Sequence, residues 1–316
     1  MTQEAAIGYP NFYQDGLDKR IETLFSTVYQ EKFYNSSPLA EITNNTFSAK
    51  IKQHGEKVII PSVPSITVRK HVVGGKMTME NPKSPAIEFP INRGNYFYFQ
   101  LDKTSLVKML NGEGFFNECT KDAGKQVDAF IGSEFMSAIV GTEDSHNSGA
   151  TAGITSVLNL GVASSPLFLT PSNVLKAVLR CQVALDEQNV SPDDWFIVLP
   201  PVAQAVLQYS DLKDISMVGG SESIINRGRI DKPIGRFKVY ISNQLKTVDE
   251  SGNTCYYIPF GRKSAIAFAS QMTSMTYFDK FEDYEGQGMR GVNLYDWKTV
   301  SPVALGFMYA TFDLGV

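Results

Sequence analysis

The first regular pattern of hydrophobic and polar positions is an amphipathic stripe near residues 17–32. Its apolar members recur at helical spacing and are Leu17, Ile21, Leu24, Phe25 and Val28. Spacings of three and four residues place such side chains on one face of a helix. The chain offers this face no obvious partner. We therefore expect the helix to dock on another part of an assembly.

From residue 46 to residue 102 the hydrophobic period changes to two. Apolar and polar residues alternate in three short segments, whose apolar members are Phe47, Ala49 and Ile51, then Ile87, Phe89 and Ile91, then Phe97, Phe99 and Leu101. This alternation is typical of half-buried strands in an antiparallel sheet.

A polar, proline-punctuated excursion, PSVPSITVRKHVVGGKMTMENPKSP, lies between these strands. Ile66, Val68 and Val72 are expected on one strand face, and the segment from Asn81 to Pro85 is interpreted as a turn. Because an isolated two-stranded hairpin is marginal in water, this one needs a partner surface. The alternative is a surface loop with no role.

A long helix is predicted over about residues 117–140. One face of it would carry Cys119, Ala123, Val127, Phe130, Ile131, Phe135, Ala138 and Ile139. The glycine- and serine-rich stretch that follows makes residues 141–155 a hinge or subdomain boundary.

Strands and helices alternate in the second half of the chain, which indicates an α/β subdomain. Thr170 and Pro171 are expected as N-cap and first-turn proline of a helix that carries Val174, Leu175, Val178, Leu179 and Leu185. The apolar run WFIVL reads as a buried strand, and Pro201 is expected to start another helix. Further strands are predicted at 236–241, 255–259 and 264–269. The fold class predicted for the whole chain is α+β.

Composition narrows the classes of function. The chain has 29 lysines and arginines against 33 acidic residues, a net charge of −4, which argues against a protein that coats nucleic acid. Cys119, Cys181 and Cys255 are far apart and suggest neither a disulfide framework nor a zinc site. The sequence shows neither a signal-peptide pattern nor an uncharged stretch of membrane-spanning length. We therefore expect a cytosolic protein without a membrane partner.

Candidate chemical motifs are weak. Gly286, Gly288 and Gly291 form a literal GxGxxG, but no strand–loop–helix context accompanies it, so a turn is preferred to a dinucleotide site. A divalent metal ion is conceivable at Asp279, Glu282, Asp283 and Glu285, although a solvated acidic surface is the simpler interpretation. The adjacent pair Asp193 and Asp194 is interpreted as a turn. No catalytic, metal or cofactor residue is predicted.

Three blocks in order resemble the major capsid protein of tailed double-stranded DNA phages, whose shell fold is the Hong Kong 97 type. They are EKVIIPSVPSITVRKH with INRGNYFYFQLD, then RGRIDKPIGRFKVYISNQL, then KSAIAFASQMTSMTYF with GQGMRGVNLYDWKTVSPVAL. The matching positions in the second and third blocks are Gly228, Ile230, Gly235, Phe237, Val239, Ser242, Asn243, Leu245, Ala265, Ile266, Phe268, Gln271, Arg290, Gly291, Val300 and Pro302.

This resemblance implies a division of the chain. Residues 1–45 would be the N-terminal arm, 46–102 the extended loop with its flanking strands, 103–149 the peripheral domain with its spine helix, 150–270 the axial domain, and 271–316 the return strands of the peripheral domain with the C-terminal segment.

The resemblance also implies a structural role in a virion rather than an enzyme. Copies would form hexamers and pentamers that close an icosahedral head around double-stranded DNA without sequence-specific binding. Scaffold and portal proteins would be partners, and assembly would take place in the host bacterial cytoplasm. An encapsulin-like nanocompartment shell remains an alternative, and a metal-dependent α/β enzyme a more distant one.

Subunit contacts are expected at two places. The arm would contribute Ile21 and Phe25. A basic loop with Arg69, Lys70 and Lys76 would rest on a neighbour's acidic segment with Glu282 and Asp283.

Overall fold

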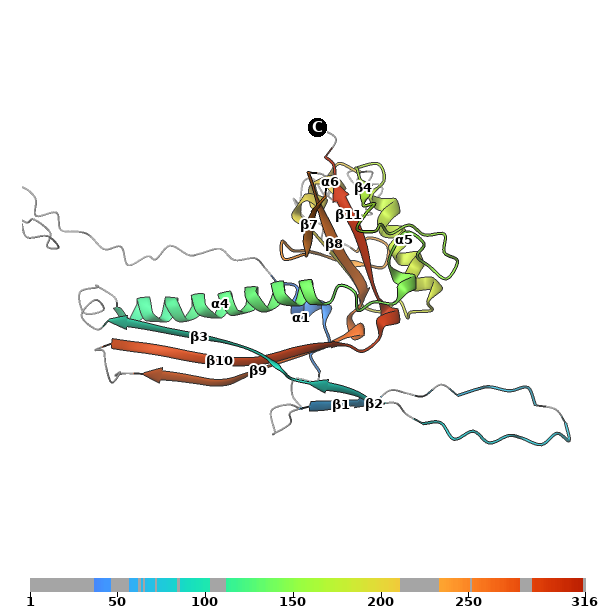
Figure 1. Ribbon diagram of the computed structural model, residues 1–316, viewed down its shortest axis with the longest axis horizontal. Coiled ribbons are helices and arrows are strands. Elements are labelled where there is room, and N and C mark those ends of the chain that lie inside the picture. The colour runs from blue at the N-terminus through green and yellow to red at the C-terminus, as the bar shows by residue number, and fades with distance from the viewer. Residues whose placement is uncertain are drawn as a thin grey trace, which may run out of the picture.

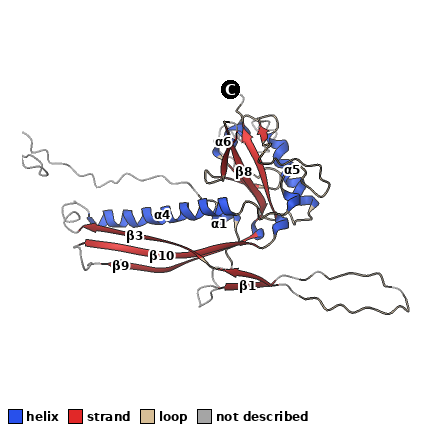
Figure 2. Ribbon diagram, in the orientation of Figure 1, coloured by secondary structure: helices blue, strands red, loops and turns tan. Residues whose placement is uncertain are grey.

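The computed structural model shows an elongated part and a compact part, joined at one end (Figure 1). The elongated part consists of helix α4 with a three-stranded sheet, and the compact part of a six-stranded sheet with helices α5 and α6 (Figure 2). Both helices and strands are present, as the sequence predicts. The described residues are 37–46, 57–61, 64, 66–71, 73–83, 86–102, 112–210, 233–250, 252–278 and 286–314.

Helix α4 runs from Gly112 to Ala138, and its 27 residues span about 40 Å. It begins five residues before the start predicted from the sequence and ends two residues before the predicted end. The sheet beside it has the order β3-β10-β9, with all neighbours antiparallel. The strands are β3 (Arg93–Asp102), β9 (Ile266–Phe278) and β10 (Gly286–Thr299).

Alternation along β3 is confirmed, since every second residue from Arg93 to Leu101 is half-buried and those between are exposed. The half-buried rings point toward α4. Phe116 of the helix packs against Phe99 and Tyr277, with ring centres 5.5 Å apart in both pairs. A row of aromatic contacts therefore fixes the helix over the sheet.

The glycines of the GxGxxG motif lie inside strand β10, so the turn expected there is wrong. Gly291 pairs with Phe97 across the sheet, and a Cβ atom on Gly291 would overlap the Phe97 ring. Cross-strand packing thus explains this glycine without any loop. No helix follows the motif either, because β10 continues to Thr299.

The compact part is built on a mixed sheet of order β4-β11-β8-β5-β6, with β7 paired to β8. Its strands are β4 (Leu167–Leu169), β5 (Trp195–Leu199), β6 (Lys238–Ile241), β7 (Thr247–Glu250), β8 (Asn253–Arg262) and β11 (Leu305–Phe312). The helices are α5 (Val174–Glu187) and α6 (Pro201–Gln208).

Strand β5 is buried along its whole length, as the WFIVL pattern predicts. Trp195, Ile197 and Leu199 belong to a core cluster with α5 and α6, whereas Phe196 and Val198 belong to a second cluster. That second cluster includes Phe135, Met136 and Ile139 from the C-terminal end of α4 and the residue just after it. The two parts of the molecule therefore share a hydrophobic core at their junction.

Helix α6 begins at Pro201, as expected. The start of α5 differs from the prediction. Thr170 and Pro171 form a turn before the helix, and Asn173 is the N-cap residue. The Asn173 side-chain oxygen accepts a hydrogen bond from the Thr170 N–H, 2.8 Å away, so it closes this turn rather than capping the helix. Leu179, predicted on the apolar face, is exposed.

Besides the segment that follows α4, the chain crosses between the two parts twice. The chain passes from β8 through the 3-10 helix Lys263–Ala265 into β9, and returns from β10 through the 3-10 helix Pro302–Ala304 into β11. The Val300 N–H donates to the Ala265 carbonyl at 2.8 Å, which ties the two crossings together. Strand β11 lies inside the six-stranded sheet, so residues 305–312 belong to the compact part; the resemblance groups residues 271–316 as the return strands with the C-terminal segment.

The stretch expected to be a hinge, 141–155, consists of turns and one short 3-10 helix, Ser145–Asn147. Asn147 is buried, and its amide nitrogen donates to the carbonyls of Val303 and Leu305. These bonds hold the segment against the start of β11.

A smaller two-stranded sheet of β1 (Lys57–Pro61) and β2 (Ala86–Pro90) lies beside the elongated part. Ile60 and Phe89 are buried against Ala267 and Ala269 of β9. The short helix α1 (Leu39–Ile42) lies near the C-terminal end of α4. The strand predicted around residues 47–51 lies outside the described residues.

Candidate assembly surfaces

The extended loop is the segment between β1 and β2, residues 62–85, and its described residues, 64, 66–71 and 73–83, project from the β1–β2 sheet away from the rest of the molecule (Figure 1). Its described residues are exposed except the half-buried Pro64, and no strand is assigned among them. Its described large apolar side chains are between 69% and 94% exposed, so they bury little surface within the subunit. The exposed apolar residues are Ile66, Val68, Val73, Met77 and Met79.

The loop turns at Val73 and Gly74, where the glycine has a φ of +78°. Of the turn expected from Asn81 to Pro85, residues 81–83 carry no turn, and residues 84 and 85 lie outside the described residues. One cross-connection joins the two halves of the loop. The Glu80 carboxylate accepts hydrogen bonds from the Thr67 N–H and hydroxyl, each 3.2 Å long.

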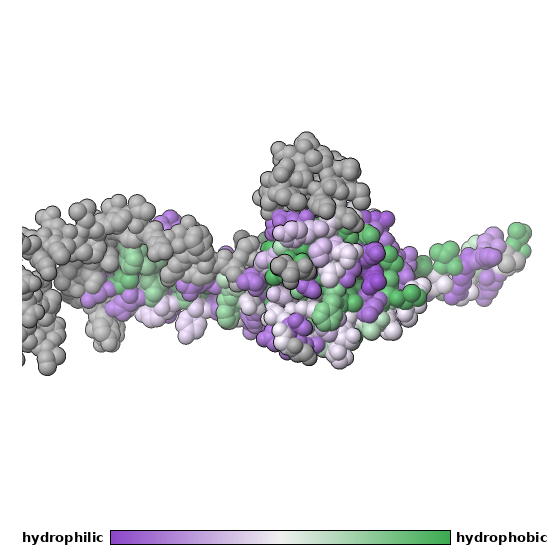
Figure 3. All heavy atoms as spheres, turned by 90° about the horizontal axis from the view of Figure 1, so that it is seen from above, coloured by the Kyte–Doolittle hydropathy of each residue, from purple (hydrophilic) through white to green (hydrophobic). Residues whose placement is uncertain are grey.

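Positive charge is concentrated on this loop. Arg69, Lys70 and Lys76, the predicted contact residues, are all exposed, as is Lys83. Seen from above, the loop shows green apolar spheres among purple polar ones (Figure 3). The other predicted contact residues, Ile21, Phe25, Glu282 and Asp283, lie outside the described residues. The expected pairing of loop and acidic segment therefore stays a prediction.

The beginning of β3 is held by a network of charged and aromatic groups. Arg93 pairs with Glu134 of α4 at 2.5 Å and with Asp296 of β10 at 3.3 Å, and its guanidinium lies over the Trp297 ring. The Tyr295 hydroxyl donates to the second oxygen of Glu134. Burial and this hydrogen bond raise the pKa of Tyr295 well above its usual range. Helix, strands and loop root thus meet at one point.

A groove with a volume of about 1400 Å³ runs between α4 and β3. Its lining is aromatic and aliphatic on both sides, with a rim of charged residues from the helix. The residues are Gly94, Asn95, Tyr96, Phe97, Tyr98, Phe99, Leu101, Phe115, Glu118, Cys119, Lys121, Asp122, Ala123, Lys125, Gln126, Val127 and Phe130.

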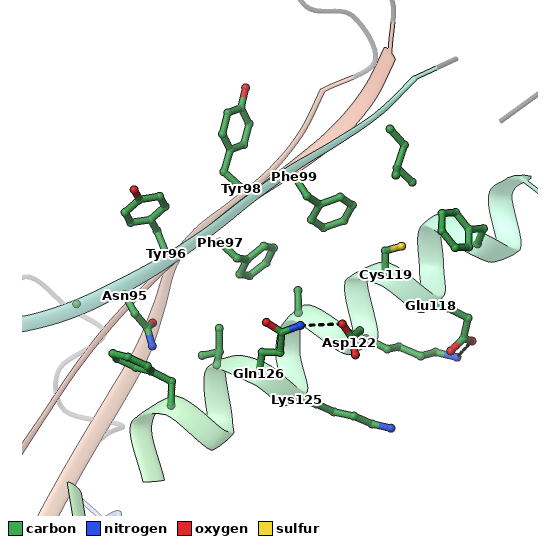
Figure 4. Close-up of a pocket in the computed structure, with 17 residues that line it drawn as sticks. Asn95, Tyr96, Phe97, Tyr98, Phe99, Glu118, Cys119, Asp122, Lys125 and Gln126 are labelled. Atoms are coloured by element: carbon green, nitrogen blue, oxygen red, sulfur yellow. Dashed lines mark hydrogen bonds and ion pairs between the residues drawn. The ribbon is translucent and has the colours of Figure 1, made fainter. Parts of the chain in front are cut away.

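Figure 4 shows how these side chains lie. Asn95, Phe97 and Phe99 point from β3 toward the helix, and Cys119 and Gln126 point from the helix toward the strand, whereas Tyr96 and Tyr98 point away. The Asn95 amide nitrogen and oxygen are buried and make no hydrogen bond with the described residues. Side chains of α4 and β3 thus face each other across the groove without filling it.

The groove was not predicted from the sequence, although part of its helical wall lies on the predicted apolar face of α4. Cys119, Ala123, Val127 and Phe130 belong to the helix face predicted from the sequence. They line the groove, and Phe130 is 57% exposed. Ile131 and Phe135 of the same predicted face are buried, as is Phe116, which the prediction did not include. Periodicity identifies an apolar stripe but does not tell which edge of it meets the sheet.

The described residues provide little for catalysis or metal binding. They contain no group of three or more potential metal ligands. Asp193 and Asp194 form a turn, as expected, and point to different partners: Asp193 accepts from Ser191, and Asp194 from Lys238. The Lys238 hydrogen bond and charge lower the pKa of Asp194. Nor do the described helices include one with the length and apolar character needed to cross a bilayer.

Comparison with known proteins gives a result at the level of structure alone. No protein-family model matches the chain, and no curated protein sequence matches it. Solved structures do match over nearly the whole length. A chain from Mycobacterium phage Che8 superimposes with a TM-score of 0.70 at 15% identity, covering 94% of this chain and 98% of that one.

Two further structures are described as capsids. A chain from the capsid of the cyanophage P-SCSP1u gives a TM-score of 0.69 at 14% identity and covers 99% of both chains. A chain from the mature capsid of bacteriophage PhiM1 gives 0.61 at 10% identity, covering 92% of this chain and 91% of that one. The elongated part, the compact part and the extended loop thus form a fold that this chain shares with phage capsid chains.

Proposed function

We propose that this chain is a structural subunit of a phage head, in which it serves as the major capsid protein and carries out no catalysis. The observation that carries this proposal is the extended loop, whose described residues include apolar and cationic side chains that the subunit itself leaves exposed. Apolar side chains held away from their own core are best explained by burial against another copy. Likeness to capsid chains over nearly the whole length supports the same conclusion.

In this proposal the elongated part corresponds to the peripheral domain of the Hong Kong 97-type fold and α4 to its spine helix. The compact part corresponds to the axial domain. Copies would assemble into hexamers and pentamers that close an icosahedral head around double-stranded DNA in the host bacterial cytoplasm, with scaffold and portal proteins as partners. The loop of one subunit would lie over the elongated part of its neighbour, with Arg69, Lys70 and Lys76 toward Glu282 and Asp283.

A loop replacement tests this role. Residues 62–85 are replaced by a short glycine-rich turn between β1 and β2, which leaves the buried root residues Ile60 and Phe89 in place. The variant subunit should melt as cooperatively as the parent, since the described part of the loop makes almost no contact with the rest of the subunit. Closed particles, scored by negative-stain microscopy, should fail to form.

A matched control separates folding from assembly. Phe89→Ala removes a fully buried ring at the root and should destabilise the subunit by about 3 to 5 kcal/mol. If the loop replacement unfolds the subunit as Phe89→Ala does, or if it still forms closed particles, the loop does not have the proposed role. Nucleic acid inside particles purified from infected cells would distinguish a head from a nanocompartment.

A further inference from the structure

The groove between α4 and β3 is large enough to hold a segment of polypeptide, and its two walls carry aromatic rings. Its volume of about 1400 Å³ exceeds the upper end of the usual range for small-molecule pockets, about 300 to 1,000 Å³. Phe97, Phe99 and Phe130 contribute rings to its two walls. A space of this size and shape suits a polypeptide segment better than a compact ligand.

The described chain begins at the inner end of this groove. A Cβ atom on Gly132 of α4 would contact the Ser37 side chain, which places Ser37 directly against the helix. Leu39 and Val127 both pack against the buried cluster that contains Ile131, and Val127 also lines the groove. The segment that precedes Ser37 in the sequence is therefore joined to the described chain beside the groove.

Length and pattern single out one segment of those residues. On α4 the groove extends from Phe115 to Phe130, about 22 Å along the helix axis. A helix over residues 17–28, which the apolar stripe of Leu17, Ile21, Leu24, Phe25 and Val28 predicts, would be about 18 Å long. The nine residues from Val28 to Ser37 can span up to about 30 Å, enough to reach any point of the groove.

We propose that the apolar stripe of residues 17–28 occupies the α4–β3 groove of its own chain. Tethering supports the same-chain assignment, because a short linker holds the segment at an effective concentration in the millimolar range. Ile21 and Phe25, expected from the sequence to contact a neighbouring subunit, would then complete the elongated part instead. The unpaired Asn95 amide lies on the groove wall, where a bound segment allows it to find a partner after a side-chain rotation.

The chain contains a natural reporter for this contact. Cys119 lines the groove and is partly exposed, whereas Cys181 and Cys255 are fully buried. In a Phe25→Cys variant, a short bis-maleimide should join position 25 to Cys119 within a single chain, seen as one cross-linked peptide pair in the monomer band. The pair should disappear when Cys119→Ser is added.

Two further variants, each with one added cysteine beside the three native ones, serve as controls. Thr23→Cys lies on the opposite face of the predicted helix and should cross-link far less than Phe25→Cys. Val73→Cys lies at the turn of the extended loop and should not cross-link to Cys119. Removal of residues 1–30 should in addition raise the rate of Cys119 alkylation at least about tenfold, the factor that corresponds to ~1.4 kcal/mol of protection by the arm.

Each remaining outcome overturns the proposal. If the Phe25→Cys cross-link joins two chains, the arm contacts a neighbouring subunit. If Val73→Cys cross-links to Cys119, the extended loop of a neighbour occupies the groove. If no cross-link forms and the truncation does not change the rate of Cys119 alkylation, the arm does not occupy the groove. Microscopy of the same samples reports separately on whether particles form, so this test is independent of the proposed role in a shell.

Discussion

The Arg93 guanidinium lies 4.1 Å from the centre of the Trp297 ring. The same guanidinium pairs with Glu134 on α4 and with Asp296 on β10. One side chain at the start of β3 thus contacts the long helix and the central strand of the sheet at once. Strand β2, from which the extended loop leaves, ends at Pro90, three residues before Arg93.

Arg93→Ala should therefore destabilise the subunit. The Arg93 and Glu134 side chains are 40% and 32% exposed, so solvent screens the ion pair and it contributes no more than about 1 kcal/mol. Loss of the contact with Trp297 brings the expected total to about 1 to 2 kcal/mol. The midpoint of guanidinium chloride unfolding measures this difference.

Arg180→Ala on the exposed side of α5 is the matched control and should change stability by less than about 0.5 kcal/mol. Arg93→Lys should recover only part of the loss, because an ammonium group lacks the planar fork that pairs with two carboxylates and stacks on a ring. Equal midpoints for Arg93→Ala and Arg180→Ala would show that the network contributes nothing measurable.

Gly291 gives a second prediction, from packing inside the sheet. A Cβ atom there would overlap the Phe97 ring, so Gly291→Ala forces the ring or the strand to move. The expected cost is about 1 to 3 kcal/mol. Thermal or chemical unfolding of the purified subunit measures it.

Gly124→Ala is its control, since no atom lies within 4 Å of the place that a methyl group would take at this helical glycine. Alanine there should stabilise the subunit by about 0.5 to 1 kcal/mol, because it restricts the unfolded backbone more than glycine does. If both substitutions shift stability in the same direction, contact with Phe97 does not explain the glycine in β10.

This glycine also shows why part of the fold escaped prediction. The segment GQGMRGVN has the local composition of a turn, and only its neighbour across the sheet shows that a side chain at residue 291 would collide. By contrast, the alternation of Phe97, Phe99 and Leu101 and the apolar run of β5 are local patterns, and both were predicted correctly.

The groove was not predicted from the sequence for a related reason. An apolar stripe on α4 was evident, but whether Cys119 and Phe130 meet the sheet or face open space depends on where the helix sits over the strands. That offset is set by contacts such as Phe116 with Phe99 and Tyr277, which join residues far apart in the sequence. Sequence periodicity alone does not contain this information.

The Thr155–Glu187 contact predicts a dependence on pH. Hydrogen bonds from the Thr155 N–H and hydroxyl, 3.1 and 2.8 Å long, lower the pKa of the Glu187 carboxyl. Because the folded state favours the ionised form, this contribution to stability is present above the ordinary glutamate pKa and is lost as the pH falls through the lowered value. Thr155→Val should raise the Glu187 pKa toward its usual range.

Titration of the Glu187 side-chain carboxyl carbon by NMR measures that shift. Thr170→Val removes a hydroxyl that bonds to Ser172 instead, so it should leave the Glu187 pKa as in the parent. An unchanged Glu187 pKa in Thr155→Val would assign the effect to the backbone N–H alone.

The last prediction concerns charge between subunits and rests on the proposed shell. Arg69 and Lys70 are exposed on the extended loop, and Glu282 and Asp283 are their expected partners on a neighbour. An exposed ion pair contributes only about 0.2 to 1 kcal/mol, but a shell repeats it at every subunit contact. Assembly should therefore weaken as the ionic strength rises above the level at which the Debye length is about 8 Å.

Charge reversal tests whether the two charged segments touch or only keep two separate surfaces soluble. Arg69→Glu with Lys70→Glu should block assembly, since it turns attraction into repulsion, and Arg69→Gln with Lys70→Gln should only weaken it. Adding Glu282→Lys and Asp283→Lys to the reversed pair should partly restore particles, because opposite charges then face each other again. If the reversed pair alone assembles with the yield and salt dependence of the parent, the loop does not rest on that acidic segment. Restoration by the second pair, which no general effect of net charge explains, would identify the two segments as neighbours.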